Sequence, residues 1–122
     1  MTLNGSLYKI SSHDGGNFAL LMLAGHPVYE GHFPGEPVTP GVLTLAMVRE
    51  CASELAGNWL QYKAIKSCRF AATIRPGDSL ILNIDMTNDG RMYQLKAEIN
   101  DQDGNLRLTL EATLESVAGH AV

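Results

Sequence analysis

The sequence has few of the features that mark several common protein classes. Its two cysteines, Cys51 and Cys68, lie far apart and form no CxxC pair, so we expect reduced thiols and neither a disulfide framework nor a metal site. Its apolar runs are short, such as FALLML at 18–23, whereas a bilayer span needs about 20 residues. The first residues lack a cationic start followed by an apolar segment, so we expect a cytoplasmic protein.

Positive charge is also scarce. Nine Lys and Arg stand against thirteen Asp and Glu, a formal net charge of -4, which argues against nucleic acid as the main partner. Apolar residues make up 45% of the chain, as in ordinary globular proteins, and 122 residues suffice for one hydrophobic core. We therefore expect a single domain over residues 1–122.

One helix pattern stands among several strand patterns. Short strands are expected at 6–10 and 18–23, separated by a glycine-rich turn. A helix is expected over 41–56, with Thr39 as its N-cap, Pro40 at its first position and Gly57 just past its end. The first half of this helix is apolar on almost every side, which is typical of a helix buried in a core.

The remainder of the chain has the pattern of antiparallel strands, expected at 62–73, 79–86, 92–99 and 106–117. Pro-Gly and Asp-Gly turn signals separate them, and the last strand alternates strictly between apolar and polar residues. Each strand can thus hide one face against the helix. The pattern predicts an α+β fold, with an antiparallel sheet wrapped around one long central helix.

Three features meet in the stretch GHFPGEPVTPGVL at 31–43. His32 stands among prolines that restrict the backbone, and an imidazole pKa of roughly 6.5 suits a general acid or base. The helix start offers free N–H groups at Gly41 and Val42 to a carbonyl oxygen that gains negative charge, and glycine lets a substrate approach closely. An apolar wall suited to an acyl chain follows: Val42, Leu43, Leu45 and Ala46.

This stretch resembles the signature of the FabA/FabZ-type 3-hydroxyacyl-[acyl-carrier-protein] dehydratases, which reads His-Phe-Pro-x-x-Pro-x-x-Pro-Gly-Val-Leu. The segment CRFAATIRPGDSL at 68–80 also resembles a strand-turn segment of that family. The resemblance implies the hotdog fold and dehydration of 3-hydroxyacyl thioesters to trans-2-enoyl thioesters, in fatty-acid-like, polyene or polyketide biosynthesis. It implies no cofactor, because the substrate is carried on the phosphopantetheine arm of acyl-carrier protein.

The resemblance also implies residue roles. His32 is the main acid–base residue, and the backbone N–H of Gly41 polarises the thioester carbonyl. The helix carboxylate of the family falls at position 46, which is alanine here, and no Asp or Glu occurs between Glu36 and Glu50. The residues expected to bind substrate are Phe33, Pro40, Val42, Leu43 and Ala46.

Three explanations for the missing acid stay open. A carboxylate elsewhere could substitute: Glu50, one turn further along the helix, or Glu36 or Glu30 in the loop. His32 could instead perform both proton transfers on one face of the substrate. The chain could also be a non-catalytic or partner-dependent accessory subunit that binds acyl-carrier protein and pairs with a second dehydratase chain. A thioesterase or hydratase on the same fold is a weaker option, because the helix start lacks a carboxylate.

Partners are indicated by a cluster of cations and by the resemblance. If the strand is regular, three of the four cations share one face, which either docks the acidic carrier protein or is simply solvated. The resemblance implies a homodimer or higher homo-oligomer with sheets paired edge to edge, or a heterodimer with a related dehydratase. No nucleic acid or membrane partner is expected. The cations proposed for carrier-protein docking are Lys63, Lys66, Arg69 and Arg75.

Overall fold

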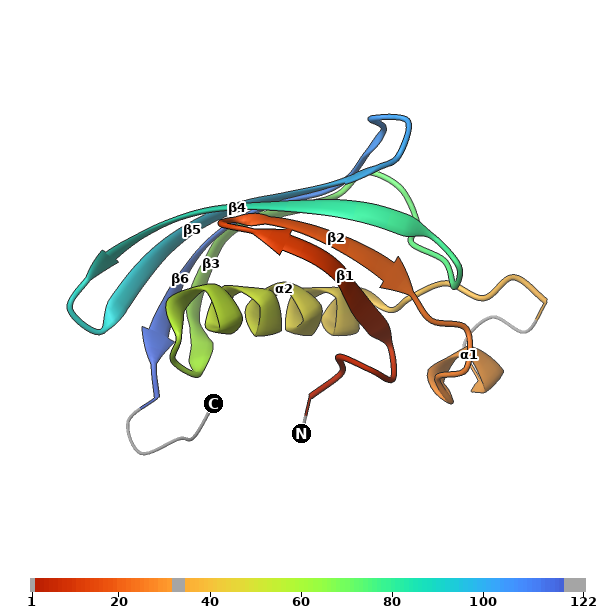
Figure 1. The fold of residues 1–122 in the computed structure, drawn as a ribbon, viewed down its shortest axis with the longest axis horizontal. Helices are drawn as coiled ribbons and strands as arrows, with labels where there is room; N and C mark the ends of the chain where they lie inside the picture. Colours follow the sequence, from red (N-terminus) through yellow and green to blue (C-terminus); the bar gives the residue numbers. More distant parts are fainter. Residues whose placement is uncertain (1, 32–34, 118–122) are drawn as a thin grey trace.

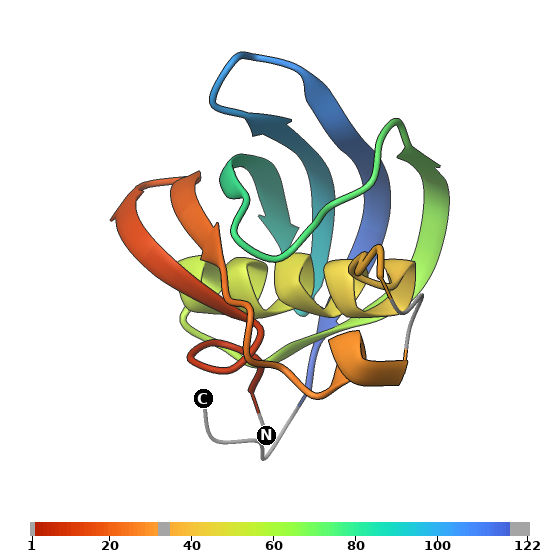
Figure 2. The ribbon, with the colours of Figure 1, turned by 90° about the vertical axis from the view of Figure 1, so that its right-hand side faces the viewer.

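The computed structural model describes residues 2–31 and 35–117. The chain begins with β1 (Tyr8–Asp14), β2 (Asn17–Met22), the short helix α1 (Val28–Gly31) and the long helix α2 (Gly41–Ala56). It continues with β3 (Leu60–Phe70), β4 (Ser79–Asp89), β5 (Met92–Asp101) and β6 (Leu106–Ser116). The strands form one antiparallel sheet in the order β1-β2-β4-β5-β6-β3. The sheet curves over α2, which lies on its concave side (Figures 1 and 2). This arrangement confirms the predicted hotdog fold.

The core lies between α2 and the concave face of the sheet. The middle of the helix contributes Met47, Val48, Cys51 and Ala52, all fully buried. Strands β4, β5 and β6 alternate between buried and more exposed residues, as the sequence predicts for 106–117. Each fully buried leucine or valine stabilises the fold by about 1.5–3 kcal/mol. The inward residues of β5 and β6 are Tyr93, Leu95, Ala97, Ile99, Leu108, Leu110, Ala112 and Leu114.

The two ends of α2 are terminated differently. At the C-terminal end Gly57 adopts a left-handed conformation with φ of 73°, and its N–H donates to the Ser53 carbonyl at 2.9 Å. At the N-terminal end the expected Thr39 cap is wrong. Pro40 occupies the N-cap position in an extended conformation, and the helix has no side-chain cap. The first turn therefore lacks the acceptor that a threonine cap would have supplied.

Strand β3 forms one edge of the sheet and pairs only with β6 among the described strands. Its register shifts twice, and Lys63 and Lys66 are the extra residues at the two bulges. The strand is thus irregular, and the bulge at Lys66 brings this residue to the same outer side as Lys63 and Arg69. The bulges place four β3 residues opposite the inward residues of β6, facing the concave side: Tyr62, Ile65, Cys68 and Phe70.

This edge leaves one side of α2 uncovered. Val42 is 73% exposed, and on β3 Ile65 and Phe70 are 44% and 47% exposed. The prediction that the apolar first half of the helix is buried is therefore wrong for its first turn in the single chain. On β3 the reason is geometric, because within residues 2–31 and 35–117 no strand lies beyond it.

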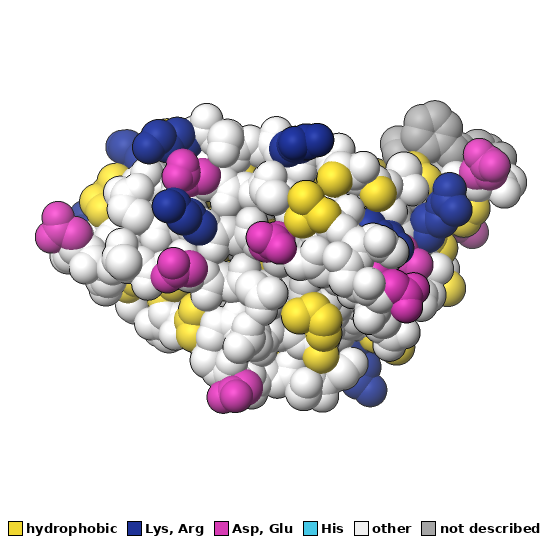
Figure 3. All heavy atoms as spheres, turned by 90° about the horizontal axis from the view of Figure 1, so that it is seen from above, with side chains coloured by type: hydrophobic (Ala, Val, Ile, Leu, Met, Phe, Trp, Pro, Cys, Tyr) yellow, Lys and Arg dark blue, Asp and Glu magenta, His cyan; other side chains and the backbone are white. Residues whose placement is uncertain are grey.

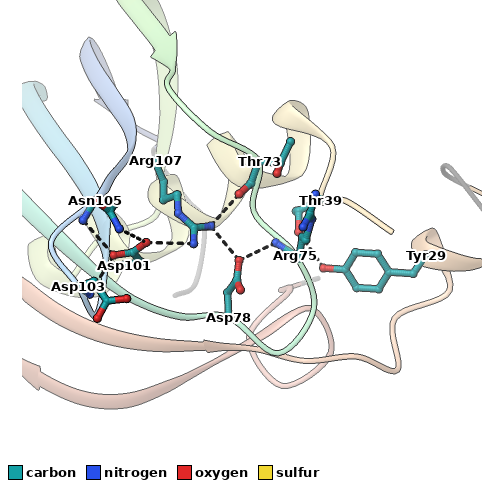
Figure 4. A network of polar contacts seen from close by, with 9 residues as sticks. All are labelled: Tyr29, Thr39, Thr73, Arg75, Asp78, Asp101, Asp103, Asn105 and Arg107. Atoms are coloured by element: carbon teal, nitrogen blue, oxygen red, sulfur yellow. Dashed lines mark hydrogen bonds and ion pairs between the residues drawn. The ribbon is translucent and has the colours of Figure 1, made fainter. Parts of the chain in front are cut away.

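A polar network fixes the connection between β3 and β4 (Figure 4). Arg107 on β6 donates to Asp78 at 2.9 Å, to Asp101 at 3.2 Å and to the Thr73 carbonyl at 2.7 Å. Asp78 also accepts the N–H of Arg75 at 2.8 Å, which closes the turn. The network holds segment 73–78 against the end of the sheet, and residues of that segment form part of the pocket described next.

Candidate active site

A pocket of about 370 Å³ opens at the N-terminal end of α2. Three parts of the chain form it: the segment before the helix, the first turn of the helix, and the end of β3 with the residues that follow. Its surface is mostly apolar, and no lining residue is an Asp, a Glu, a Lys or an Arg. The lining residues are Val38, Thr39, Pro40, Gly41, Thr44, Phe70, Ala72, Thr73 and Ile74.

The helix presents free hydrogen-bond donors at this pocket. The N–H groups of Leu43 and Thr44 both donate to the Pro40 carbonyl at 3.1 Å. Those of Gly41 and Val42 have no acceptor within the described part of the chain. Since the N-terminus of a helix carries partial positive charge, these donors can stabilise a carbonyl oxygen that becomes negative.

A side chain at position 41 would require the Phe70 ring to move. A Cβ added there would lie 2.9 Å from Cζ of Phe70, whose ring rests against the glycine. Phe70 is therefore a wall of the pocket beside the helix N–H groups. From the sequence, Phe70 was noted only as part of the CRFAATIRPGDSL segment, and no role was predicted for it.

Only some of the predicted site residues line this pocket. Pro40 and Gly41 line the pocket. His32 and Phe33 lie outside the described residues, so their roles stay predictions. Leu43 packs partly buried against the core, and Val42 points to solvent beside the free edge of β3. Ala46 is half-buried and does not line the pocket of the single chain.

Glu50 does not fit the role of substitute acid. Its side chain is buried, with 8% exposure, and its carboxylate accepts hydrogen bonds from Leu3 N–H at 2.8 and 2.9 Å. Asn4 N–H at 3.2 Å and the Tyr8 hydroxyl at 2.9 Å complete the set. The carboxylate thus anchors the N-terminal segment to α2 and is not directed at the Gly41 pocket.

The groups around Glu50 are held in their neutral forms. Burial is the main cause that raises the pKa of Tyr8, with the nearby Cys51 and Glu50 adding to it. Burial likewise raises the pKa of the Cys51 thiol to about 12. Both groups are therefore protonated at neutral pH and serve packing. Glu36 and Glu30, in contrast, are exposed.

The cations proposed for docking are partly neutralised. Lys63 lies 3.7 Å from Glu115, and Lys66 lies 3.9 Å from Glu111, both on β6. Arg69 and Arg75 are exposed and form no ion pair within the described ranges. Figure 3 shows cationic and anionic side chains interspersed over the convex face of the sheet. The cations on the outer side of β3 are therefore interspersed with carboxylates, and their role in docking stays a prediction.

A second hollow lies away from this site. It measures about 410 Å³ and lies on the outer face of the sheet. Its lining is a row of alternating charges across four strands, Asp85, Lys96, Glu111 and Lys66. Opposite charges on neighbouring strands stabilise a solvated sheet face, so we assign this hollow no chemistry.

Metal chemistry has no ligand set in the described structure. Within residues 2–31 and 35–117, no three His, Cys, Asp or Glu side chains form a group that could hold a metal ion. In the same ranges no helix is long and apolar enough to cross a membrane.

Comparison with known proteins shows the family to which this chain belongs. The family model described as ApeI dehydratase matches residues 10–107, most of the chain. The chain belongs to the ApeI-like dehydratase family. This family assignment agrees with the resemblance to FabA/FabZ-type dehydratases in the sequence.

Curated relatives of this ApeI-like chain include two bacterial FabZ dehydratases. The 3-hydroxyacyl-[acyl-carrier-protein] dehydratase FabZ of Syntrophobacter fumaroxidans is 32% identical over 104 residues, which cover 78% of this chain and 69% of that protein. The FabZ of Chloroflexus aggregans is 34% identical over 92 residues, 67% of this chain and 64% of the relative. For the FabZ of Blochmanniella floridana the covered share is 48%. The chain therefore spans about half to two thirds of the length of these relatives.

Solved structures share the fold at lower identity. The dehydratase heterocomplex ApeI:P from Xenorhabdus doucetiae matches with a TM-score of 0.67 and 20% identity, covering 88% of this chain and 93% of that chain. The PaaI protein of the E. coli phenylacetic acid degradation operon matches with a TM-score of 0.69 and 13% identity, over 94% and 83% of the two chains. At identities this low, the match shows only that the proteins share a fold.

Proposed function

We propose that the chain dehydrates 3-hydroxyacyl thioesters on acyl-carrier protein to trans-2-enoyl thioesters, with His32 as the main acid–base residue. The observation that carries the proposal is the uncapped start of α2. Its Gly41 and Val42 N–H groups have no acceptor in the described structure, and Gly41 lines a pocket with a mostly apolar surface. Membership in the ApeI-like dehydratase family supports the reaction type.

The reaction balances with these groups. Gly41 N–H donates to the thioester carbonyl and lowers the energy of the enolate-like charge that develops on its oxygen. His32 removes the C2 proton, the C2–C3 double bond forms, and the C3–O bond breaks. The imidazolium returns its proton to the departing hydroxide, which leaves as water and regenerates neutral His32. This route needs no carboxylate at position 46.

The direct test is turnover of a 3-hydroxyacyl-carrier-protein substrate, followed as loss of water by mass spectrometry. We expect the wild type to form the enoyl product and His32→Ala to lose activity by about 10²–10⁴-fold. Glu54→Ala, a change of an exposed residue near the opposite end of α2, is the control. Equal rates for wild type and His32→Ala would reject the proposal.

We further propose that the site is completed in a dimer formed along the free edge of β3. The exposed apolar side chains of Ile65 and Phe70 lie on the edge strand that such a partner would cover. A second copy of this chain extends the sheet by antiparallel pairing, as unpaired strand edges readily do. We expect a dimer mass in light scattering at micromolar concentration.

A second candidate function is that of an accessory subunit that binds acyl-carrier protein and needs a related dehydratase chain. Ala46 favours it, because the position cannot supply a carboxylate and no described Asp or Glu lines the pocket. The heterocomplex architecture of ApeI:P is consistent with it. Full activity of the purified homodimer would exclude it, and activity that appears only on co-expression with a related chain would establish it.

A further inference from the structure

Tyr29 and Thr39 join two segments beside the pocket through their hydroxyl groups. The Tyr29 hydroxyl oxygen lies 2.8 Å from Thr39 Oγ1, and both residues are 9% exposed. In Figure 4 the tyrosine ring reaches from α1 toward Thr39. Burial raises the pKa of Tyr29, so its hydroxyl keeps its proton at neutral pH. The hydrogen bond therefore connects α1 to the segment that leads directly into α2.

The backbone of Thr39 is fixed from another direction. Its N–H donates to the carbonyl of Ile74 at 2.7 Å. Ile74 is 3% exposed and lines the pocket together with Thr39 and Gly41. Thr39 thus joins α1, through its side chain, to the connection between β3 and β4, through its backbone. Thr39 is followed directly by Pro40 and by Gly41 and Val42, whose N–H groups are free within the described part of the chain.

The other end of the segment is fixed as well. Val28 N–H donates to Nδ1 of His26 at 3.0 Å, and the Tyr29 ring belongs to the hydrophobic core. The Tyr29–Thr39 bond spans a sequence separation of 10 residues. It therefore closes a loop of the chain between α1 and α2. His32 lies within this loop in the sequence.

Buried hydroxyl groups need hydrogen-bond partners, which explains why Tyr29 and Thr39 bond to each other. That need alone does not explain why the Thr39 hydroxyl points to Tyr29 and not to the helix. A threonine beside a helix start commonly accepts hydrogen bonds from the first N–H groups of the helix. Here its hydroxyl is bonded to Tyr29, and α2 has no side-chain cap. The bond thus leaves the N–H groups of Gly41 and Val42 available to a substrate.

We propose that Tyr29 is a positioning residue of the dehydratase site. Its hydrogen bond to Thr39, named here the Tyr29–Thr39 clasp, fixes the entry to α2 and closes the loop that contains His32. Tyr29 acts through Thr39 and touches no substrate. This inference rests on the proposed function for its catalytic consequence, whereas its structural consequence can be measured without turnover.

The test compares Tyr29→Phe and Thr39→Val with the double variant, each of which keeps the side-chain volume close to the original. Peptide-resolved amide exchange over residues 35–43 should speed up by about fivefold in each single variant and no further in the double variant. The imidazole resonance of His32 should shift, and its titration midpoint should change. Turnover should fall by about tenfold in kcat, with KM unchanged within a factor of about two.

Two controls separate the clasp from general destabilisation. Thr39→Ser keeps the hydroxyl and should restore wild-type exchange and turnover. Tyr93→Phe removes another buried tyrosine hydroxyl, one that bonds Asn58 at 3.4 Å beyond the C-terminal end of α2. It should leave exchange over 35–43 and the His32 resonance unchanged.

The outcomes distinguish this inference from the proposed function. Unchanged exchange in Tyr29→Phe and Thr39→Val, or an unchanged His32 titration, overturns the clasp whether or not the wild type turns substrate over. A wild type without turnover rejects the proposed function alone, since faster exchange and a shifted His32 resonance would still support the clasp.

Discussion

For single residues, the structure distinguishes two positions on α2 that bear on the missing acid. Position 46 holds an alanine, and the next acidic residue of the helix, Glu50, is committed to the N-terminal segment and Tyr8. Sequence spacing alone placed Glu50 one turn from Ala46 and made it a candidate acid. Only the positions of Leu3 and Tyr8 reveal its anchoring role, because those contacts cross more than forty residues of sequence.

Removing the Glu50 carboxylate should lower the free energy of unfolding without lowering the turnover rate. Glu50→Ala leaves buried donors on Leu3 and Tyr8 without an acceptor, which costs about 2–4 kcal/mol of unfolding free energy. Glu50→Gln keeps one acceptor oxygen, so about half that loss is expected. Urea unfolding measures both, with exposed Glu54→Ala as the control on the same helix. Turnover of folded Glu50→Gln should match the wild type, and a selective loss of kcat would instead make Glu50 the missing acid.

Substitution of Gly41 at the helix start should lower activity, because a side chain there meets the Phe70 ring. Gly41→Ala places a methyl group 2.9 Å from the Phe70 ring, so the ring must move from the pocket wall. We expect a fall in kcat/KM of about 10²-fold, since displacement by about 1 Å at a reacting group has that effect. Gly41→Ala combined with Phe70→Leu should regain part of the loss. No regain would show that the ring does not shape this pocket.

At the scale of elements, strand β3 is where sequence reasoning was least reliable. Its existence and its place beside the Pro-Gly turn were predicted, because apolar alternation and turn residues signal both. The two bulges were not, because no residue type marks where a register shifts. Lys66, whose parity differs from that of Lys63, consequently also reaches the outer side of the sheet, where the two lysines lie near Glu111 and Glu115.

The free edge of β3 gives a prediction about assembly. Ile65, 44% exposed near the middle of the strand, should lie in the interface if β3 pairs with a second chain. Ile65→Lys should then convert the dimer to a monomer in light scattering. Ile81→Lys is the matched control, because Ile81 is 38% exposed on β4, which is not an edge strand. A dimer that survives Ile65→Lys would place the interface elsewhere.

At the scale of the whole molecule, the fold followed from local signals that agree with one another. The expected helix coincides with α2 apart from its start, where Pro40 is the N-cap and not the first helical residue, and Gly57 ends it as expected. The alternation of 106–117 correctly identified the inward face of β6. The pocket wall could not be predicted, because Phe70, Ile74 and Thr39 meet Gly41 only after the sheet has curved around the helix. Long-range polar contacts, such as those of Arg107, likewise leave no periodic trace.

The central claim is that this chain alone carries a working acid–base site at the start of α2. The measurement that tests it most directly is the rate of water loss from a 3-hydroxyacyl-carrier-protein substrate, with the purified wild-type chain and His32→Ala compared at equal dimer concentration. We expect product to rise linearly with wild-type protein and to fall by at least about 10²-fold in His32→Ala. Product formation at the same rate with both proteins, or none with either, would contradict it.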